Sequence, residues 1–357
     1  MKRILKLVGA IILVGILYLC LYPIDLEPIA RTSPTYPGME GEFKVNNKLT
    51  GIDFIEVDGI GPESITQDSL GNFYSGLENG DIIKFDSLLS NKEIVGNTGG
   101  RPLGMKFAPN GILVIADQVK GLVALDSLGV VQTLLNEIDG TPILFADDLA
   151  ITKEGVIYFS DATQRNPIEV ENEFWEQRAT GRVISYDLNT KETSVVLDNL
   201  FFANGVALDS NEEYILINET FGIQIKKHWI KGDKKGTTEL FNNRLPGYPD
   251  NITFLNGIFW VAVPSQRAIA VEPLTELPFV RSMLLRLPRS VIEGAVPEPY
   301  SMVLGFDLDG KLKYNLQDPE GGFDYITSVL QVNNKLYLGS LKETGIGIYT
   351  LKEKTND

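Results

Sequence analysis

The sequence predicts an all-β fold, a six-bladed β-propeller with an N-terminal transmembrane helix. Three observations lead to this prediction. Short runs rich in Ile, Val, Tyr and Phe are separated by Gly, Asn and Asp, a pattern typical of strands and tight turns. One strand–turn–strand pattern recurs along the chain, and an apolar stretch stands at its N-terminus.

The N-terminal stretch has the pattern of a membrane-spanning helix. The basic residues Lys2, Arg3 and Lys6 precede Leu7–Tyr22, a run of sixteen residues without a charge. At about 1.5 Å per residue, a helix ending at Tyr22 nearly crosses a hydrocarbon core of about 30 Å. We therefore expect a membrane anchor over residues 1–22, with a cleaved signal peptide as the alternative. The basic flank predicts that the rest of the chain lies on the extracytoplasmic side of the membrane.

The anchor is followed by a linker and then by the repeating body of the chain. Residues 23–44 are predicted to form an extended linker, because four prolines fall within them: Pro23, Pro28, Pro34 and Pro37. The propeller is expected over residues 45–357, interrupted by an insertion at about 267–300.

The repeats supply the blade count. Six copies of the pattern can be aligned so that one position of each first strand shares a register, at Glu63, Leu103, Asp147, Asn204, Asp250 and Thr327. Antiparallel repeats of roughly 40–50 residues are typical of propeller blades, whereas a β-sandwich has no such period. The long step from Asp250 to Thr327 locates the insertion.

The composition excludes several kinds of site. The chain carries a net charge of −15, one cysteine, Cys20, and one histidine, His228. A three-histidine zinc site, a Cys₂His₂ site and a histidine pair are therefore impossible. The acidic balance also argues against a nucleic-acid partner, since phosphates attract Lys and Arg. His228 falls in an outer strand, where we expect it to be solvated.

The shared register is the most informative feature for function. First strands line the channel of a propeller, so equivalent positions of successive blades form a ring around it. Four of the six positions hold an acid or an amide, and a further amide follows directly, which brings together Glu63, Asp147, Asn204, Asp250 and Asn251. Oxygen ligands without His or Cys suit a hard cation, and five of them favour Ca²⁺. The alternative is that these side chains lie at turn edges and face water.

The residues around these positions carry a family resemblance. The chain resembles the strictosidine synthase-like family over about residues 45–350, in the segments Gly61-Pro-Glu-Ser, Arg101-Pro-Leu-Gly, Phe145-Ala-Asp-Asp-Leu, Phe202-Ala-Asn-Gly-Val and Pro249-Asp-Asn-Ile. More distantly it is similar to paraoxonases, gluconolactonases and diisopropyl-fluorophosphatase. That similarity implies a six-bladed propeller with Ca²⁺ in its channel.

The resemblance also implies a ligand set. Glu63, Asn204, Asp250 and Asn251 match the ligands of the channel calcium in those relatives. Asp147 falls where the relatives usually have Asn, which adds a third carboxylate to this site. We expect tighter cation binding as a result, or one carboxylate that stays partly protonated.

Departures from the family patterns narrow the chemistry. The glutamate that serves the plant synthase in condensation is replaced by Thr327, and a single histidine excludes the pair attributed to paraoxonases. What remains is calcium-dependent hydrolysis of a small ester or lactone, with Asp250 and Asp147 as catalytic carboxylates. A non-catalytic interaction propeller with a structural calcium is the alternative.

The insertion contains a basic, amphipathic segment over Phe279–Arg289. It carries Arg281, Arg286 and Arg289 and no acid. Three interpretations remain open from the sequence: a helix packed on the propeller, a lid over a substrate, or a contact with the membrane surface.

Overall fold

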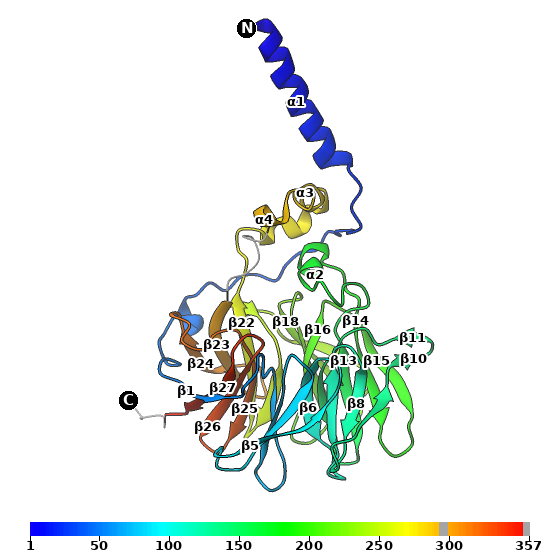
Figure 1. Cartoon of the computed structure of the whole chain (residues 1–357), viewed down its shortest axis with the longest axis vertical. Helices are drawn as coiled ribbons and strands as arrows, with labels where there is room; N and C mark the ends of the chain where they lie inside the picture. Colours follow the sequence, from blue (N-terminus) through cyan, green and yellow to red (C-terminus); the bar gives the residue numbers. More distant parts are fainter. Residues whose placement is uncertain (293–298, 353–357) are drawn as a thin grey trace. The chain divides into compact units, whose positions relative to one another are not determined.

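Short apolar strands and tight turns make up most of the chain, and neighbouring strands pair into antiparallel sheets. The computed structural model describes residues 1–292 and 299–352. In this part of the chain, six sheets form the blades of a β-propeller, as the repeats predicted (Figure 1). Each blade begins with the strand that lines the channel.

The first three blades follow the chain directly. Blade 1 consists of β2 (Ile65–Gln67), β3 (Phe73–Gly76), β4 (Asp81–Phe85) and β5 (Lys92–Asn97). Blade 2 consists of β6 (Pro102–Phe107), β7 (Leu113–Asp117), β8 (Gly121–Leu125) and β9 (Val131–Leu135). After the hairpin of β10 (Glu137–Ile138) and β11 (Thr141–Pro142), blade 3 consists of β12 (Ala146–Ile151), β13 (Val156–Asp161), β14 (Gly181–Asp187) and β15 (Thr193–Leu200).

The last three blades include the interrupted one. Blade 4 consists of β16 (Ala203–Leu208), β17 (Tyr214–Glu219), β18 (Gln224–Trp229) and β19 (Thr238–Asn242). Blade 5 consists of β21 (Ile252–Leu255), β22 (Ile258–Gln266), β23 (Pro299–Phe306) and β24 (Leu312–Asp318), and β20 (Gly247–Tyr248) also pairs with β22. Blade 6 contains β25 (Ile326–Val332), β26 (Lys335–Ser340) and β27 (Gly345–Thr350).

The two ends of the propeller sequence meet in blade 6. Strand β1 (Asp53–Glu56) pairs antiparallel with β27, with Ile55 opposite Ile346. Figure 1 shows the blue β1 beside the red strands of the C-terminal blade. The ring is therefore closed by backbone hydrogen bonds between distant parts of the chain, which the repeat pattern did not reveal.

The channel strands share an irregularity that positions the candidate site. The pairing of β12 with β13 shifts register between Ala146 and Leu149, so that Asp147 and Asp148 lie in a bulge. The same shift occurs in β16, between Ala203 and Val206, and in β6, between Pro102 and Met105. A bulge re-aims the side chains that it contains, and here it recurs at the predicted register.

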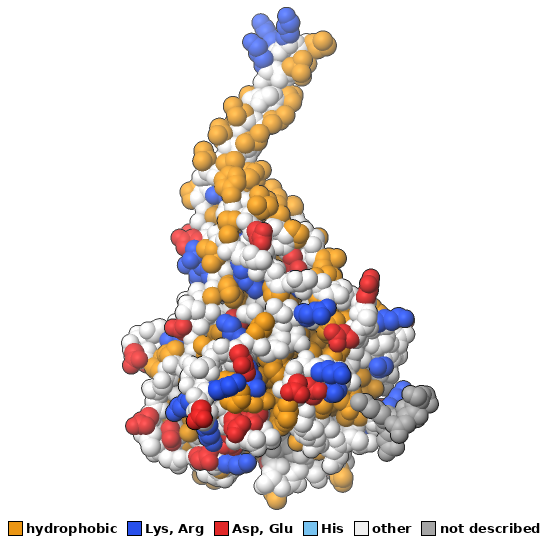
Figure 2. Space-filling model, turned by 180° about the vertical axis from the view of Figure 1, so that it is seen from behind, with side chains coloured by type: hydrophobic (Ala, Val, Ile, Leu, Met, Phe, Trp, Pro, Cys, Tyr) orange, Lys and Arg blue, Asp and Glu red, His pale blue; other side chains and the backbone are white. Residues whose placement is uncertain are grey.

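A second unit is formed by residues 1–33, 168–178 and the described part of 267–298. It contains α1 (Lys2–Leu21), α2 (Glu171–Glu176), α3 (Pro278–Leu284) and α4 (Arg289–Ile292), with the 3₁₀ turn η2 (Glu272–Glu276). A further 3₁₀ turn, η1 (Gly41–Phe43), belongs to the propeller unit. Helix α1 is long and apolar enough to cross a membrane. Figure 2 shows its apolar side chains as an orange column with basic side chains at the free end.

Residues 23–38, after α1, form no helix or strand, and part of this segment is fixed by hydrogen bonds. The amide of Ile29 donates to the carbonyl of Glu176 over 3.0 Å, and that of Arg31 donates to the carbonyl of Thr275 over 3.0 Å. Residues 23–33 are therefore held within the second unit. Farther on, Phe43 and Leu49 are already buried in the propeller unit, ahead of β1.

Two expectations about local structure need correction. The segment Phe279–Arg289 is helical only in its first half, because α3 ends at Leu284 and α4 begins only at Arg289, after Pro288, which has no amide hydrogen to donate. His228 lies on β18, as the alternating pattern predicted, but it is buried rather than solvated. Its Nδ1 lies 2.8 Å from the hydroxyl of Thr238, and burial lowers its pKa.

Candidate metal centre in the propeller channel

The predicted ligands lie at the N-terminal ends of channel strands. Glu63 lies two residues before β2, Asp147 and Asn204 lie in β12 and β16, and Asp250 and Asn251 precede β21. All five side chains are buried. The bulges in β12 and β16 orient Asp147 and Asn204.

Hydrogen bonds connect four of the five predicted ligands in pairs. The amide Nδ2 of Asn251 donates to Oε1 of Glu63 over 2.5 Å. The side chain of Asn204 donates to the carboxylate of Asp250. The negative charges of Asp250 and Glu63 act on Asp147 and add to the rise in its pKa. Residues that lie up to 188 positions apart in the sequence thus meet at one end of the channel.

Three oxygen atoms of this group have no hydrogen-bond partner among the described residues. They are Oε2 of Glu63, Oδ1 of Asn204 and Oδ1 of Asn251, and all three are buried. A buried acceptor without a partner costs about 1–3 kcal/mol, so three together require an explanation. A cation that accepts their lone pairs would satisfy all of them at once.

The carboxylates of the site favour their protonated forms when no cation is present. Burial raises the pKa of Asp250 to about 7, although the Asn204 hydrogen bond opposes this shift. The pKa of Glu63 and that of Asp147 are also raised well above their usual values, first by burial and then by the charge of Asp250. Loss of hydration and mutual repulsion both disfavour several negative charges in one channel.

Two basic residues lie near these acids, and one of them was not anticipated. Lys106 of β6 interacts with the charges of Asp148 and Glu63, and burial lowers its pKa. Lys106 directly follows Met105 in a channel strand. A charged residue at such a position is the sequence signal that could have identified it. Arg101 is buried beside Glu63, and its positive charge opposes the rise in the pKa of Glu63. Nη1 of Arg101 has no partner among the described residues.

Asp148 connects neighbouring blades. Its Oδ2 accepts a hydrogen bond from the backbone amide of Val206, 3.0 Å away in blade 4. Burial raises its pKa to about 6, while Lys106 and the backbone amides oppose the shift. The residue that follows Asp147 therefore stabilises the ring, and its carboxylate already has partners.

The two remaining register positions, Leu103 and Thr327, supply no charged ligand for a cation. Leu103 is apolar and buried. The hydroxyl of Thr327 donates to the backbone carbonyl of Glu63 over 2.9 Å, and Ser328 donates to the same carbonyl over 2.7 Å. Thr327 thus fixes the backbone that carries Glu63, and no carboxylate stands at its position.

The acids at the ends of the second strands have structural roles. Oδ1 of Asp161 accepts hydrogen bonds from the amides of Leu144 and Phe145, which lead into β12, and Oδ2 pairs with Arg182 over 2.9 Å. Asp117 accepts the amide of Arg101 in the same way. These acids fix the segments that enter the channel.

The donor set fits a hard cation. Among the described residues, no group of three or more His, Cys, Asp or Glu side chains is arranged as a ready metal site. The donors here are instead mixed, with carboxylates alternating with amides. Carboxylate and amide oxygens are ligands that Ca²⁺ accepts in flexible geometry, and the three unpartnered oxygens support this assignment.

A cavity of about 350 Å³ opens at the other ends of the channel strands. Its walls are largely apolar, and its polar lining includes Gln67, Lys106, Thr253 and Gln331. Lys106 thus lines this cavity and also interacts with the charges of Asp148 and Glu63.

Comparisons with known proteins place the chain in a family. Residues 41–85 match the family model for the strictosidine synthase-like N-terminal region, and residues 147–233 match the model for strictosidine synthase. The protein strictosidine synthase-like 13 of Arabidopsis thaliana is 32% identical over 341 residues, which cover 83% of each chain. The chain belongs to the strictosidine synthase-like family.

Animal members of the family are similar over most of their length. The adipocyte plasma membrane-associated protein of Bos taurus is 31% identical over 92% of this chain and 85% of its own, and the human protein is 31% identical over 92% and 84%. These matches extend over nearly the whole chain, in agreement with the family resemblance that was inferred for about residues 45–350.

Solved structures confirm the fold. A gluconolactonase from Xanthomonas campestris superposes with a TM-score of 0.63 at 13% identity, covering 93% of this chain and 99% of its own. A calcium-binding regucalcin from Agrobacterium tumefaciens superposes with a TM-score of 0.58 at 11% identity, covering 83% and 91%. At such identities the similarity establishes the six-bladed propeller and leaves the activity to the residues of the site.

Proposed function

We propose that this member of the strictosidine synthase-like family is a membrane-anchored, calcium-dependent hydrolase of small esters or lactones. The observation that carries the proposal is the set of three buried, unpartnered oxygens on Glu63, Asn204 and Asn251, next to the carboxylates of Asp147 and Asp250. The structural similarity to a gluconolactonase and to a calcium-binding regucalcin is consistent with it.

The five predicted ligands would hold the cation between them. When bound, Ca²⁺ supplies a Lewis acid that polarises the carbonyl of a substrate. Its charge would favour the ionised forms of Glu63, Asp147 and Asp250, whose pKa values are raised first by burial and then by neighbouring acids. The three carboxylates would then ionise together.

Asp250 is the residue best placed to move a proton. Its pKa of about 7 applies without a cation, and a bound cation would favour the ionised form that a general base requires. We propose that ionised Asp250 accepts the proton of the attacking water and returns it to the leaving oxygen. The hydrogen bond from Asn204 orients the carboxylate.

Asp147 would serve as the second catalytic carboxylate. It is buried, and its pKa is raised first by burial and then by Asp250 and Glu63. The negative charge of ionised Asp147 would disfavour the charged form of Asp250 and so strengthen Asp250 as a base. A condensation of the strictosidine type is not supported, because Thr327 replaces the glutamate that this reaction requires. The hydroxyl of Thr327 donates instead to the backbone carbonyl of Glu63.

One observation favours the second candidate function, a binding propeller with a structural cation. The carboxylate of Glu63 and the amides of Asn204 and Asn251 are buried to a degree typical of structural sites, with at most 4% of each residue exposed. In that case the cation would stabilise the ring without touching a substrate.

The two functions are distinguished by one experiment. The full chain in detergent micelles is stripped of calcium with a chelator and assayed on aryl esters and lactones, with and without added Ca²⁺. The hydrolase predicts turnover that returns with Ca²⁺ and is lost in Asp250→Ala. A binding propeller predicts a rise in unfolding temperature with Ca²⁺ and no turnover.

A further inference from the structure

The second unit contains an arginine that joins its separate segments. Arg281 of α3 is 2% exposed. Its guanidinium donates to the backbone carbonyls of Trp175 and Ile29, and it also donates to those of Leu274 and Thr275, each over 2.9 Å. The segment after α1, helix α2 and helix α3 are therefore fixed to one another.

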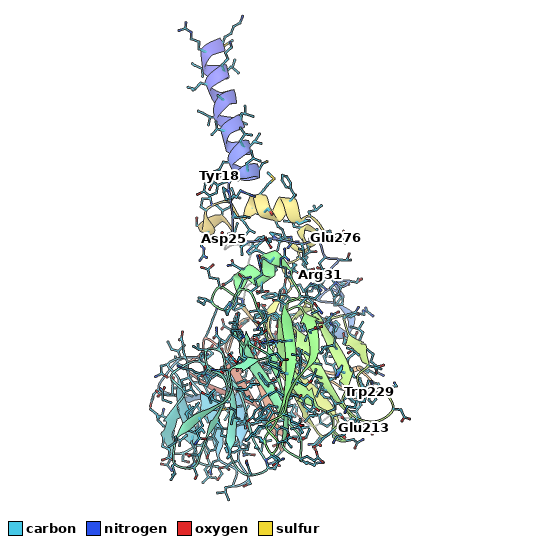
Figure 3. The ribbon with its side chains drawn as sticks, turned by 90° about the vertical axis from the view of Figure 1, so that its right-hand side faces the viewer. Tyr18, Asp25, Arg31, Glu213, Trp229 and Glu276 are labelled. Atoms are coloured by element: carbon cyan, nitrogen blue, oxygen red, sulfur yellow. The ribbon has the colours of Figure 1, made fainter. Side chains whose placement is uncertain are left out.

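A second arginine joins α3 to the end of the apolar helix. Nε of Arg286 donates over 2.5 Å to the backbone carbonyl of Tyr22, the residue that ends α1. Helices α1 and α3 are also in direct contact. Figure 3 shows the yellow α3 beside the end of α1 marked by Tyr18, with Glu276 near the start of α3.

The face of α3 opposite Arg281 is apolar. Successive residues of a helix are rotated by about 100°, so Phe279 and Met283 each point about 160° away from Arg281. Phe279 is 60% exposed, and Leu277 at the start of α3 is 49% exposed. Aromatic and aliphatic side chains on the outer face of a short helix suggest that this face is covered by another apolar medium.

The position of Tyr22 indicates which medium that is. If α1 crosses a bilayer, its twenty residues span about 30 Å, so Tyr22 lies where the hydrocarbon ends. A helix bonded to that residue lies at the depth of the lipid headgroups. Arg289 pairs with Glu169 over 2.8 Å, and Arg281 and Arg286 donate to backbone carbonyls. We therefore expect the apolar side chains of this helix, rather than its arginines, to provide the contact with lipid.

We propose that α3 is a second membrane-contacting element, which inserts Leu277 and Phe279 into the interface of the bilayer that α1 crosses. The inference rests on the membrane anchoring included in the proposed function and is independent of hydrolysis. The hydrogen bonds of Arg281 and Arg286 connect α3 to the segment that follows α1 and to α2. These segments are therefore attached to the helix that contacts the membrane.

Site-directed labelling of the full chain in phosphatidylcholine vesicles tests the proposal. In a Cys20→Ser background, single cysteines at Phe279→Cys and Leu277→Cys carry an environment-sensitive fluorophore. The exposed propeller residue Leu128, replaced by Cys, is the matched control. We expect lipid-borne quenchers to quench the labels at 279 and 277 several-fold more strongly than the label at 128, and aqueous iodide to show the reverse order.

A label on the native Cys20 of the unmodified chain separates the two ways in which the proposal can fail. If lipid quenches Cys20 but not position 279 or 277, the anchor is present and the contact of α3 is disproved. If both quenchers fail at 279, a protein surface covers α3, which also overturns the proposal. If lipid does not quench Cys20, α1 does not cross the bilayer and the inference falls together with the anchor.

Discussion

At the scale of single residues, the candidate site depends on which oxygens have partners. Oε1 of Glu63 is satisfied by Asn251, whereas its Oε2 is not. The sequence predicted this group because acids and amides recur at one register in successive repeats. It could not predict the burial of His228, because the alternating pattern of β18 does not show how deeply that strand is covered. The position of Lys106 was also not predictable, because it depends on acids in other blades.

Asp147 is the position at which the ligand set departs from related sites. Replacing Asp147 with Asn removes one carboxylate from a set of three, and the affinity of oxygen sites for Ca²⁺ increases with the number of charged ligands. We expect Asp147→Asn to weaken calcium binding about tenfold or more, measured by calorimetric titration. The control is Asp198→Asn, because Asp198 is exposed. Asp161 is unsuitable as a control, since it forms an ion pair with Arg182. Unchanged calcium affinity together with unchanged hydrolysis in Asp147→Asn would refute the role of this carboxylate.

The raised pKa values predict how the cation-free protein responds to pH. In the folded state Asp250 has a pKa of about 7 against an ordinary value of 3.8, and the pKa of Glu63 is raised in the same direction. Between the unfolded and folded values the folded chain binds more protons, so its free energy of unfolding falls as pH rises. We expect the unfolding temperature in chelator to decrease from pH 5 to pH 8.

Two comparisons identify the groups responsible for this pH dependence. Saturating Ca²⁺ should reduce the decrease, because the ligands are then ionised in the folded state. Glu63→Gln should also reduce it, because one titrating carboxylate is removed. An unfolding temperature that rises with pH in chelator would contradict the assigned pKa shifts.

At the scale of elements, the channel strands approach one another so closely that their sequences are restricted. A Cβ atom at Gly205 would lie 2.5 Å from the amide nitrogen of Ile252 and 2.7 Å from Cα of Asn251. The recurring apolar strands and turns made the blades predictable. The closure by β1 and β27 was not, because it joins segments about 290 residues apart without a repeat signal.

Gly205→Ala tests this close approach. The new methyl group contacts backbone atoms of the neighbouring strand, which cannot rotate away, so overpacking should destabilise the propeller by about 1–3 kcal/mol. Thermal unfolding of the full chain measures the effect, with Gly15→Ala as the control, since no atom lies within 4 Å of its added Cβ. An unchanged unfolding temperature for Gly205→Ala would mean that β16 and β21 are less closely packed than described.

At the scale of the whole molecule, the family and the fold constrain function only in part. The chain belongs to the strictosidine synthase-like family, and its neighbours among solved structures include a gluconolactonase and a regucalcin. Propellers serve both catalysis and binding, so the function must be argued from the channel residues. The apolar helix α1 and the family were predictable because each rests on contiguous segments of sequence, whereas the arginine contacts of α3 depend on three distant segments.

The proposed function requires that the oxygens of Glu63, Asn204 and Asn251, with Asp147 and Asp250, bind one calcium ion. Equilibrium dialysis of the chelator-stripped full chain against radioactive calcium tests it most directly. We predict one ion bound per chain, and loss of that ion in Glu63→Gln with the far-ultraviolet circular dichroism unchanged. Absence of bound calcium in the native chain, or an equal amount in Glu63→Gln, would contradict the account.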